Sequence, residues 1–190
     1  MKIACILLAA GFGKRFGGQK LLHPVDGIPM MTRACALHGS LPYAEKIAVL
    51  RSEETELCRI AQTFGFRPVD NPRASEGIGT SVAAGIGALL QQPGLDGAVL
   101  SVCDQPYLTA QTVERLLEAF RRQPERIALL QCGKQRGNPA VFPASLFPEL
   151  VKLDADEGGK VVIAKYPQRV LAVALDDAKE LMDMDTKGEN

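Results

Sequence analysis

Short hydrophobic runs alternate with longer amphipathic stretches along the whole chain. Apolar or β-branched runs, each the length of a buried strand, occupy residues 2–9, 46–50, 66–70, 97–102, 126–131 and 169–175. Between them, apolar residues recur at helical spacing, which predicts helices over 29–38, 53–64, 79–92, 109–122, 144–152 and 156–165. Strands that alternate with helices in this way predict an α/β fold, with a mostly parallel sheet covered by helices on both faces.

Composition adds limits on the class of protein. At 190 residues the chain can bury one sizeable core, and it has no internal repeat or linker, so we expect a single domain over residues 1–190. The 22 lysines and arginines equal the 22 aspartates and glutamates, so no overall charge attracts nucleic acid or an anionic membrane. Any anion-binding site must therefore be local.

The cysteines and the N-terminal run indicate a cytoplasmic protein. The cysteines are odd in number, lie mostly in apolar surroundings and lack zinc-like spacing, which favours free, buried thiols: Cys5, Cys35, Cys58, Cys103 and Cys132. The apolar run after Lys2 has about eight residues, far fewer than the roughly 20 that span a bilayer. We therefore expect a strand there and no membrane segment.

The segment LLAAGFGKRFGGQKLL, residues 7–22, leads from the first predicted strand into a glycine-rich loop without an acid. Glycines let the backbone take positive φ angles and turn N–H groups toward a ligand, and the loop has four: Gly11, Gly13, Gly17 and Gly18. Arg15 and Lys20 add positive charge, so the loop suits a triphosphate attacked at its α-phosphate. The alternative is an ordinary glycine-rich turn with solvated cations, because the pattern fits neither the Walker motif nor the dinucleotide fingerprint.

A second polar loop follows the third predicted strand. Ligands of such sheets bind outside the carboxyl ends of the strands, and this loop carries Asn71, Gly79, Thr80 and Ser81 ahead of an alanine-rich helix. Backbone donors and hydroxyls at a helix N-terminus suit a ribose, a base edge or a phosphate. Plain N-capping by Thr80 or Ser81 explains either hydroxyl equally well.

A carboxylate follows the fourth predicted strand. Asp104 comes directly after a buried run, where it can hold Mg²⁺ together with substrate phosphates and water. It can instead cap the helix that follows, although Thr109 is already placed for that role. A metal site needs a second acid, and MDMDT near the end of the chain offers Asp183 and Asp185, unless this segment is only an acidic tail.

These segments, in this order, resemble the nucleotidyltransferases of the molybdenum cofactor, within the GT-A-like nucleotidyltransferase superfamily. The opening agrees with the signature L-A-[AG]-G-x-[SG]-x-R-[MF]-G-x-x-K at every defined position. Further similarities are NPRASEGIGTSVAAGI, CDQPYLT, GNPAVFP and MDMDT, so the resemblance extends over nearly the whole chain. It implies a three-layer α/β/α Rossmann-like nucleotidyltransferase fold with a mixed, mostly parallel sheet.

The resemblance also implies a role for individual residues at the nucleotide. The first loop would contact the base and ribose through the backbone of Leu8, Ala9, Ala10 and Gly11, with Gly13 in the same cradle. The triphosphate would be bound by Arg15 and Lys20, which with Asp104 form the implied catalytic set. The nucleoside would be contacted by Asn71, Gly79 and Ser81.

Metal and acceptor positions follow from the same resemblance. Asp104 and Asp185 would hold Mg²⁺, although the chain departs from the family pattern by ending shortly after MDMDT. The acceptor side would be lined by Gly137, Asn138 and Pro139. An acceptor that is itself a phosphate monoester needs no strong general base, and His23 and His38 are expected to pack at a turn and at a helix end.

The motifs are closer to cytidylyltransferases than to guanylyltransferases, which implies transfer of CMP from CTP to molybdopterin with release of pyrophosphate. A GTP-dependent enzyme, or one that acts on another sugar or alcohol phosphate, remains open as an alternative. A non-catalytic nucleotide-binding protein that delivers cofactor is the alternative of another class. The implied macromolecular partner is a molybdoenzyme or its chaperone.

Overall fold

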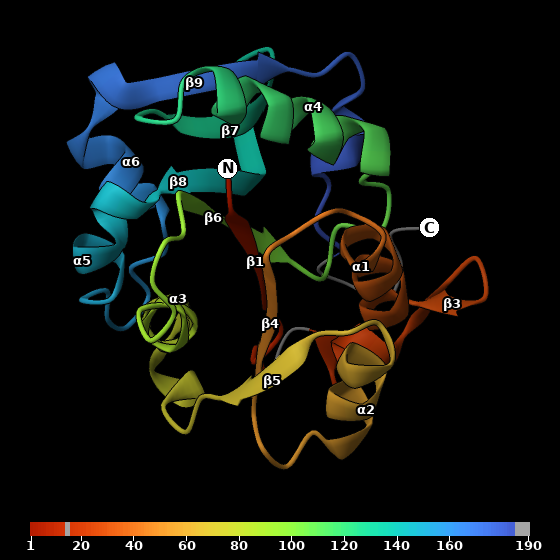
Figure 1. Ribbon diagram of the computed structural model, residues 1–190. Helices are drawn as coiled ribbons and strands as arrows, with labels where there is room; N and C mark the ends of the chain where they lie inside the picture. The colour runs from red at the N-terminus through yellow and green to blue at the C-terminus, as the bar shows by residue number, and fades with distance from the viewer. Residues whose placement is uncertain (14–15, 185–190) are drawn as a thin grey trace.

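Figure 1 shows the computed structural model of the chain, which describes residues 1–13 and 16–184. Strands form a sheet in the order β5-β4-β1-β6-β8-β7-β9. Their bounds are β1 Ile3–Leu8, β4 Glu45–Leu50, β5 Arg67–Asp70, β6 Gly97–Val102, β7 Ile127–Cys132, β8 Gln135–Pro143 and β9 Val170–Ala174. Neighbouring strands are parallel except where β8 is one of the pair, so the sheet is mixed and mostly parallel, as predicted.

Helices cover both faces of this sheet. Their bounds are α1 Met30–Gly39, α2 Thr55–Thr63, α3 Ile78–Leu89, α4 Ala110–Arg122, α5 Phe147–Leu150 and α6 Lys160–Lys165. Helices α3, α5 and α6 lie on one face, and α1, α2 and α4 lie on the other (Figure 1). The three layers confirm the predicted α/β/α architecture.

Strand β1 shows why the sheet is buried on both sides. Successive side chains of a strand point to opposite faces. Ala4 and Ile6 therefore pack in the core under α3, while Cys5 and Leu7 pack in the core under α1 and α2. All four side chains are fully buried, which explains the uninterrupted apolar run in the sequence.

Strand β8 was not predicted, and it brings distant residues to the site. It begins with the polar Gln135 and Arg136 and contains Pro139, so its sequence lacks a continuous apolar run. Because β8 is antiparallel to β6, its first residues lie at the same sheet edge as the carboxyl end of β6. A short hairpin, β2 Pro24–Val25 with β3 Ile28–Pro29, was also not predicted.

Two predicted helices are shorter than expected. The helix predicted over 144–152 is a 3₁₀ turn, Ala144–Leu146, followed by α5. The helix predicted over 156–165 begins only at Lys160, because the preceding residues bond to another part of the chain: Gly79 N–H donates to Ala155 O at 2.8 Å. Residues 154–159 are thereby held in a loop against the start of α3.

The structure also tests the expectations for a membrane segment and for the cysteines. Within residues 1–13 and 16–184, no helix combines the length and the apolar character needed to cross a bilayer. All five cysteines are free, and Cys5, Cys35 and Cys103 are buried. Burial raises the pKa of the Cys35 thiol to about 12, so this side chain behaves as a neutral core residue.

Candidate active site

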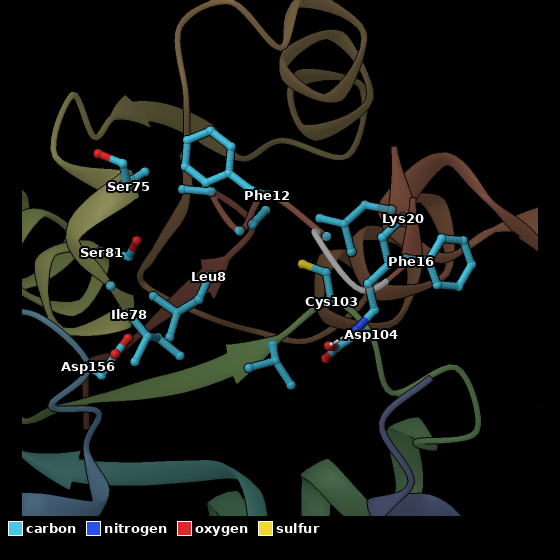
Figure 2. A pocket seen from close by; sticks show the side chains of 18 residues that line it. Leu8, Phe12, Phe16, Lys20, Ser75, Ile78, Ser81, Cys103, Asp104 and Asp156 are labelled. Atoms are coloured by element: carbon cyan, nitrogen blue, oxygen red, sulfur yellow. Dashed lines mark hydrogen bonds and ion pairs between the residues drawn. The ribbon is translucent and has the colours of Figure 1, made fainter. Parts of the chain in front are cut away.

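A cavity of about 460 Å³ opens at the carboxyl edge of the sheet, where β1 and β6 end. The order of strands reverses at β1, with β4 on one side and β6 on the other, and such a switch point is the usual ligand site of an α/β sheet. Figure 2 shows Lys20 and Asp104 at one end of the cavity and Ser75, Ser81 and Asp156 toward the other. We call the end with Lys20 and Asp104 the charged end, and the end with Ser75 and Ser81 the hydroxyl-lined end, although Asp156 adds a carboxylate to the latter.

The glycine-rich loop forms one wall of the cavity. Five of its predicted contact positions line the space: Leu8, Ala9, Ala10, Gly11 and Gly13. Gly13 has a φ of 57°, and a Cβ there would lie 2.9 Å from Gly18 O, so the tight turn excludes a larger residue. Arg15, predicted to bind the triphosphate, lies outside the residues that the structure describes.

Lys20 and Asp104 form an ion pair across the charged end. Lys20 Nζ donates to Asp104 Oδ2 at 2.7 Å, and the side chains are 12% and 23% exposed. Lys20 belongs to a 3₁₀ turn, Lys20–Leu22, that follows the glycines, and Asp104 follows β6. The two predicted catalytic residues, 84 positions apart in sequence, are thus in direct contact.

The second carboxylate oxygen of Asp104 has the chemistry to bind a cation. Asp104 Oδ1 is buried and has no hydrogen-bond partner among the described residues. A buried carboxylate oxygen without a partner is costly unless a further group binds it, and Mg²⁺ prefers such oxygens. Among the described residues no group of three or more His, Cys, Asp or Glu side chains surrounds a metal position, and Asp185 lies outside them. Asp104 therefore fits a metal ion as one of its protein ligands.

The hydroxyl-lined end is shaped by the start of α3. Ser81 lines the cavity, whereas Asn71 and Gly79 do not. The buried Asn71 instead donates from Nδ2 to the Thr80 and Ser81 hydroxyls, at 2.9 Å each. The N-cap of α3 is Gly77, with no side-chain capping bond, so neither hydroxyl caps the helix, and Thr80 donates to Gly77 O at 2.8 Å. Asn71 holds Ser81 in position from behind the cavity wall.

The loop of residues 154–159 is one part of the site that sequence reasoning missed. A Cβ on Gly79 would lie 2.5 Å from Asp154 O, so the backbone of α3 is in close contact with the backbone of this loop. The contact places the Asp156 side chain on the cavity wall (Figure 2). The Gly158-Gly159 pair is the signal that could have marked a loop here, because glycines disfavour the helix that was predicted.

A second cavity of about 380 Å³ adjoins the first. Leu8, Ile78 and Asp156 line both of them. Gly137 and Asn138, predicted for the acceptor side, line the second cavity, whereas Pro139 does not. The sequence therefore predicted two residues that line this cavity. It gave no indication of the apolar residues that line the rest of it.

The aromatic residue Phe12 stands at the mouth of the first cavity and was not predicted. It is 42% exposed, and Arg51 Cζ lies 3.9 Å from the centroid of its ring. Arg51 is itself paired with Glu53 and Glu54. A cation–π contact with Arg51, which the two glutamates hold in place, therefore stabilises the position of the Phe12 ring.

The structure offers no activated nucleophile within its described part. Cys103 lines the cavity, but full burial raises the pKa of its thiol, which keeps it protonated. His38 Nε2 lies 3.0 Å from Ser101 Oγ, and burial lowers the pKa of this histidine to about 3. His38 lies in the last turn of α1 as a neutral structural residue, near the helix end as predicted.

Comparison with known proteins finds a family model that matches most of the chain. The family described as the MobA-like NTP transferase domain matches residues 5–170. A relative from Rhodobacter capsulatus named molybdenum cofactor guanylyltransferase is 33% identical, over 93% of this chain and 86% of its own. A relative from Paenarthrobacter nicotinovorans named nicotine blue oxidoreductase is 31% identical, over 95% of this chain and 91% of its own.

Solved structures share the fold. Rv0371c from Mycobacterium tuberculosis H37Rv superposes with a TM-score of 0.83 at 22% identity, covering 98% of this chain and 94% of its own. A complex of Rv0371c with manganese has a TM-score of 0.72 at 20% identity, covering 93% and 90%. The 4-diphosphocytidyl-2C-methyl-D-erythritol synthase from Anaerococcus prevotii has a TM-score of 0.72 at 14% identity, covering 98% and 91%. The predicted nucleotidyltransferase fold is confirmed.

Proposed function

The chain belongs to the family of MobA-like NTP transferase domains, and on this premise we propose that it transfers CMP from CTP to the phosphate of a molybdopterin-type acceptor. An acceptor phosphate oxygen attacks the α-phosphorus of CTP. The bond from that phosphorus to the oxygen bridging to the β-phosphate breaks, and pyrophosphate leaves. The proposal includes a molybdoenzyme or its chaperone as the protein that receives the product, and a cytoplasmic location.

The contact between Lys20 and Asp104 carries the proposal. It brings a cation and a carboxylate to the charged end of the cavity, beside the backbone of a glycine loop. Phosphoryl-type transfer needs positioning and charge neutralisation more than covalent chemistry. The Lys20 ammonium can neutralise negative charge that grows on the leaving pyrophosphate, and the loop N–H groups can hold the phosphate oxygens. Arg15 would add a second positive charge to this end.

A phosphate monoester acceptor explains why the site needs no general base. Its second pKa is about 6, so near neutral pH it is already an anionic nucleophile. The protonated thiol of Cys103 and the neutral, buried His38 are consistent with such a site. The protein would then act by holding the acceptor phosphate close to the triphosphate and by neutralising the negative charge that develops during the transfer.

We propose that the divalent metal is Mg²⁺. Asp104 would bind it through the oxygen that has no other partner, with Asp185 as the second ligand. When bound, the ion would neutralise charge on the phosphates of the nucleotide. On the nucleoside side, the backbone of residues 8–11 and Ser81 would contact base and ribose. Asn71 and Gly79 would act there through the position of α3.

The base specificity is tested by measuring pyrophosphate release with each of the four NTPs, Mg²⁺ and molybdopterin. We expect CTP to react fastest. The Rhodobacter capsulatus relative named a guanylyltransferase makes GTP the second candidate, and faster release from GTP would replace the CTP proposal. Absence of release with any NTP, together with intact cofactor delivery by an Asp104→Ala variant, would favour the non-catalytic delivery protein.

A further inference from the structure

We propose that Glu180 is a positioning residue for the metal site. Residues 178–184, which we call the strap, consist of a 3₁₀ turn, Ala178–Leu181, and residues 182–184. No strap residue lines either cavity. The inference rests on the proposed function, in which Asp104 and Asp185 hold Mg²⁺, and it assigns the residue that fixes the chain leading to the second acid.

Glu180 is joined by three hydrogen bonds to the start of α4, 68 and 71 positions earlier in the chain. Its Oε2 accepts from the Thr109 N–H at 3.0 Å and from the Thr109 hydroxyl at 2.9 Å, and its Oε1 accepts from the Thr112 hydroxyl at 2.9 Å. Thr109 already caps α4 by accepting from the Thr112 N–H at 3.2 Å. Since the helix has its own cap, the consequence of the Glu180 contacts is to hold the strap.

The strap continues into the hydrophobic core after Glu180. The Leu181 side chain is buried in the cluster that includes Val113 and Leu117 of α4. A Cβ on Gly137 would lie 3.1 Å from Leu181 Cδ2, so the strap also packs against the first half of β8. The charged hydrogen bonds and this apolar contact therefore fix the same short stretch of chain.

The end of the strap is bonded to the candidate metal ligand itself. The Met184 N–H donates to Asp104 O at 2.9 Å. The Met184 side chain is buried together with Phe16, which belongs to the glycine-rich loop. Asp185, the proposed second ligand, follows Met184 in the sequence and lies outside the described residues. The strap thus links the start of α4 to the backbone of the residue whose carboxylate would bind the metal.

This linkage matters because a metal site made by distant residues depends on where the chain segments are before the ion binds. When a segment is in the competent position for only a fraction of the time, the apparent affinity falls in proportion to that fraction. Glu180 precedes Met184 by four residues, so its bonds restrict the strap just ahead of the contact with Asp104. Glu180 therefore raises the metal affinity without touching the metal.

The first test follows the strap in the full chain without metal or nucleotide. Amide hydrogen exchange of Met184 is measured by NMR, with Ile6 in β1 as the internal reference. We expect Glu180→Ala to speed exchange at Met184 at least about tenfold and to leave Ile6 unchanged, because only the strap is released. Unchanged exchange at Met184 would overturn the proposal.

A matched control removes a carboxylate that ties together another pair of elements. Glu149 of α5 accepts from Lys165 Nζ at 2.6 Å and from the Tyr166 hydroxyl, and it lines neither cavity. Glu149→Ala should leave exchange at Met184 unchanged. Thr112→Val removes one donor to Glu180 from the side of α4 and should give a smaller effect of the same sign. Fully additive losses in the double variant with Glu180→Ala would contradict the proposal, because the two residues would then act separately.

The second test separates positioning from a merely structural role. Mn²⁺ affinity is measured without nucleotide, by electron paramagnetic resonance of free Mn²⁺. We expect Glu180→Ala to weaken Mn²⁺ binding at least about fivefold and Glu149→Ala to leave it unchanged. Thermal stabilisation by CTP in the presence of EDTA should be retained in Glu180→Ala, which shows that the variant is folded. Wild-type Mn²⁺ affinity in Glu180→Ala would overturn the positioning role.

Kinetics distinguish this inference from the proposed function. In Glu180→Ala, the Mg²⁺ concentration that gives half the maximal rate of pyrophosphate release should rise at least about fivefold, and kcat at saturating Mg²⁺ should return toward the wild-type value. Pyrophosphate release with an unchanged Mg²⁺ dependence would overturn the inference and leave nucleotidyl transfer standing. Loss of Mn²⁺ affinity in Glu180→Ala, in a chain that releases pyrophosphate from no NTP, would support the inference while the proposed function fails.

Discussion

The ammonium of Lys20 donates a hydrogen bond to the carboxylate of Asp104, at 2.7 Å from Oδ2. The pair is partly buried, so solvent screens it less than a surface pair. A metal ion at the same carboxylate would meet this positive charge at close range. Under the proposed function, nucleotide phosphates would attract the ammonium away, so we expect the pair to oppose metal binding until a triphosphate binds.

Replacing Lys20 by methionine should therefore raise the affinity for metal in the absence of nucleotide. We expect Mn²⁺ to bind about tenfold more tightly to the Lys20→Met variant, measured by electron paramagnetic resonance of free Mn²⁺. The same variant should bind CTP less tightly and lose turnover, because a cation at the phosphates is gone. Lys165→Met is the matched control, since it removes a lysine paired with Glu149 at 2.6 Å, away from the cavity lining. An unchanged Mn²⁺ affinity in Lys20→Met would refute the competition.

Asp104→Asn should remove the metal site itself. The amide keeps the size of the side chain but loses the charge, and a neutral oxygen is a weak ligand for Mn²⁺ or Mg²⁺. We expect loss of Mn²⁺ binding with or without CTP, and at least about a hundredfold fall in kcat for pyrophosphate release. Near-normal Mn²⁺ binding by the folded variant would show that the metal is held elsewhere.

Gly11 offers a test of whether the first cavity holds the nucleotide. Apart from its chain neighbours, a Cβ at this position would have no atom of residues 1–13 and 16–184 within 4 Å, and Gly11 lines the cavity, so the methyl group of Gly11→Ala would enter the cavity. The folded state should be unaffected, while stabilisation by CTP in a thermal-shift assay should fall by at least half. Gly87→Ala is the control: outside its own helix, its Cβ would meet Val151 Cγ2 at 3.9 Å and no other atom of the described residues within 4 Å, and it lies outside the cavity lining. Equal CTP stabilisation in wild type and Gly11→Ala would argue against the predicted base and ribose contacts.

Much of this site could be predicted because its parts follow strands. Continuous apolar runs in the sequence predict that β1 and β6 are buried, and the loops after these strands contain Lys20 and Asp104. The sequence could not show that these two side chains meet, because a distance across 84 residues depends on how β1 pairs with β6. Parallel pairing of those strands brings both loops to one edge.

The second cavity was harder to predict for two physical reasons. Strand β8 contains Pro139 and begins with polar residues, so its antiparallel place in the sheet has no clear hydrophobic signal. The 154–159 loop is held by contacts with Gly79 at the start of α3, and such tertiary contacts override local helical periodicity. The predictions for Arg15 and Asp185 concern residues outside the described ranges and stay predictions.

The contact between α3 and this loop makes Gly79→Ala a test of the shared wall. A Cβ would lie 2.5 Å from Asp154 O and 2.8 Å from Glu157 O, which are backbone atoms that must shift. We expect a loss of about 1–3 kcal/mol in the free energy of unfolding, measured by urea denaturation. Gly87→Ala in the same helix should instead stabilise by about 0.5–1 kcal/mol, because alanine favours the helix. A neutral Gly79→Ala would mean that the loop is not held against α3.

The buried His38 predicts how stability changes with pH. Burial lowers its pKa from 6.5 to about 3, and its ring nitrogens contact Tyr43 Oη and Ser101 Oγ, each at 3.0 Å. Above pH 6.5 the histidine is neutral in both the folded and the unfolded chain. Between pH 6.5 and 3 only the unfolded chain binds this proton, so His38 lowers the free energy of unfolding by at most about 1.4 kcal/mol per unit of acidification.

Glutamine in place of His38 removes the titrating group and keeps a donor and an acceptor in the same space. The difference in unfolding free energy between wild type and His38→Gln should therefore be constant above pH 7 and should shift in favour of the variant as the pH falls toward 4. Carboxylates that titrate in the same range cancel in this difference, since both proteins contain them. Urea denaturation at intervals of half a pH unit measures it, and the ring proton resonances of His38 should not titrate above pH 4. A parallel pair of stability curves would show that His38 charges in the folded protein as readily as in the unfolded one.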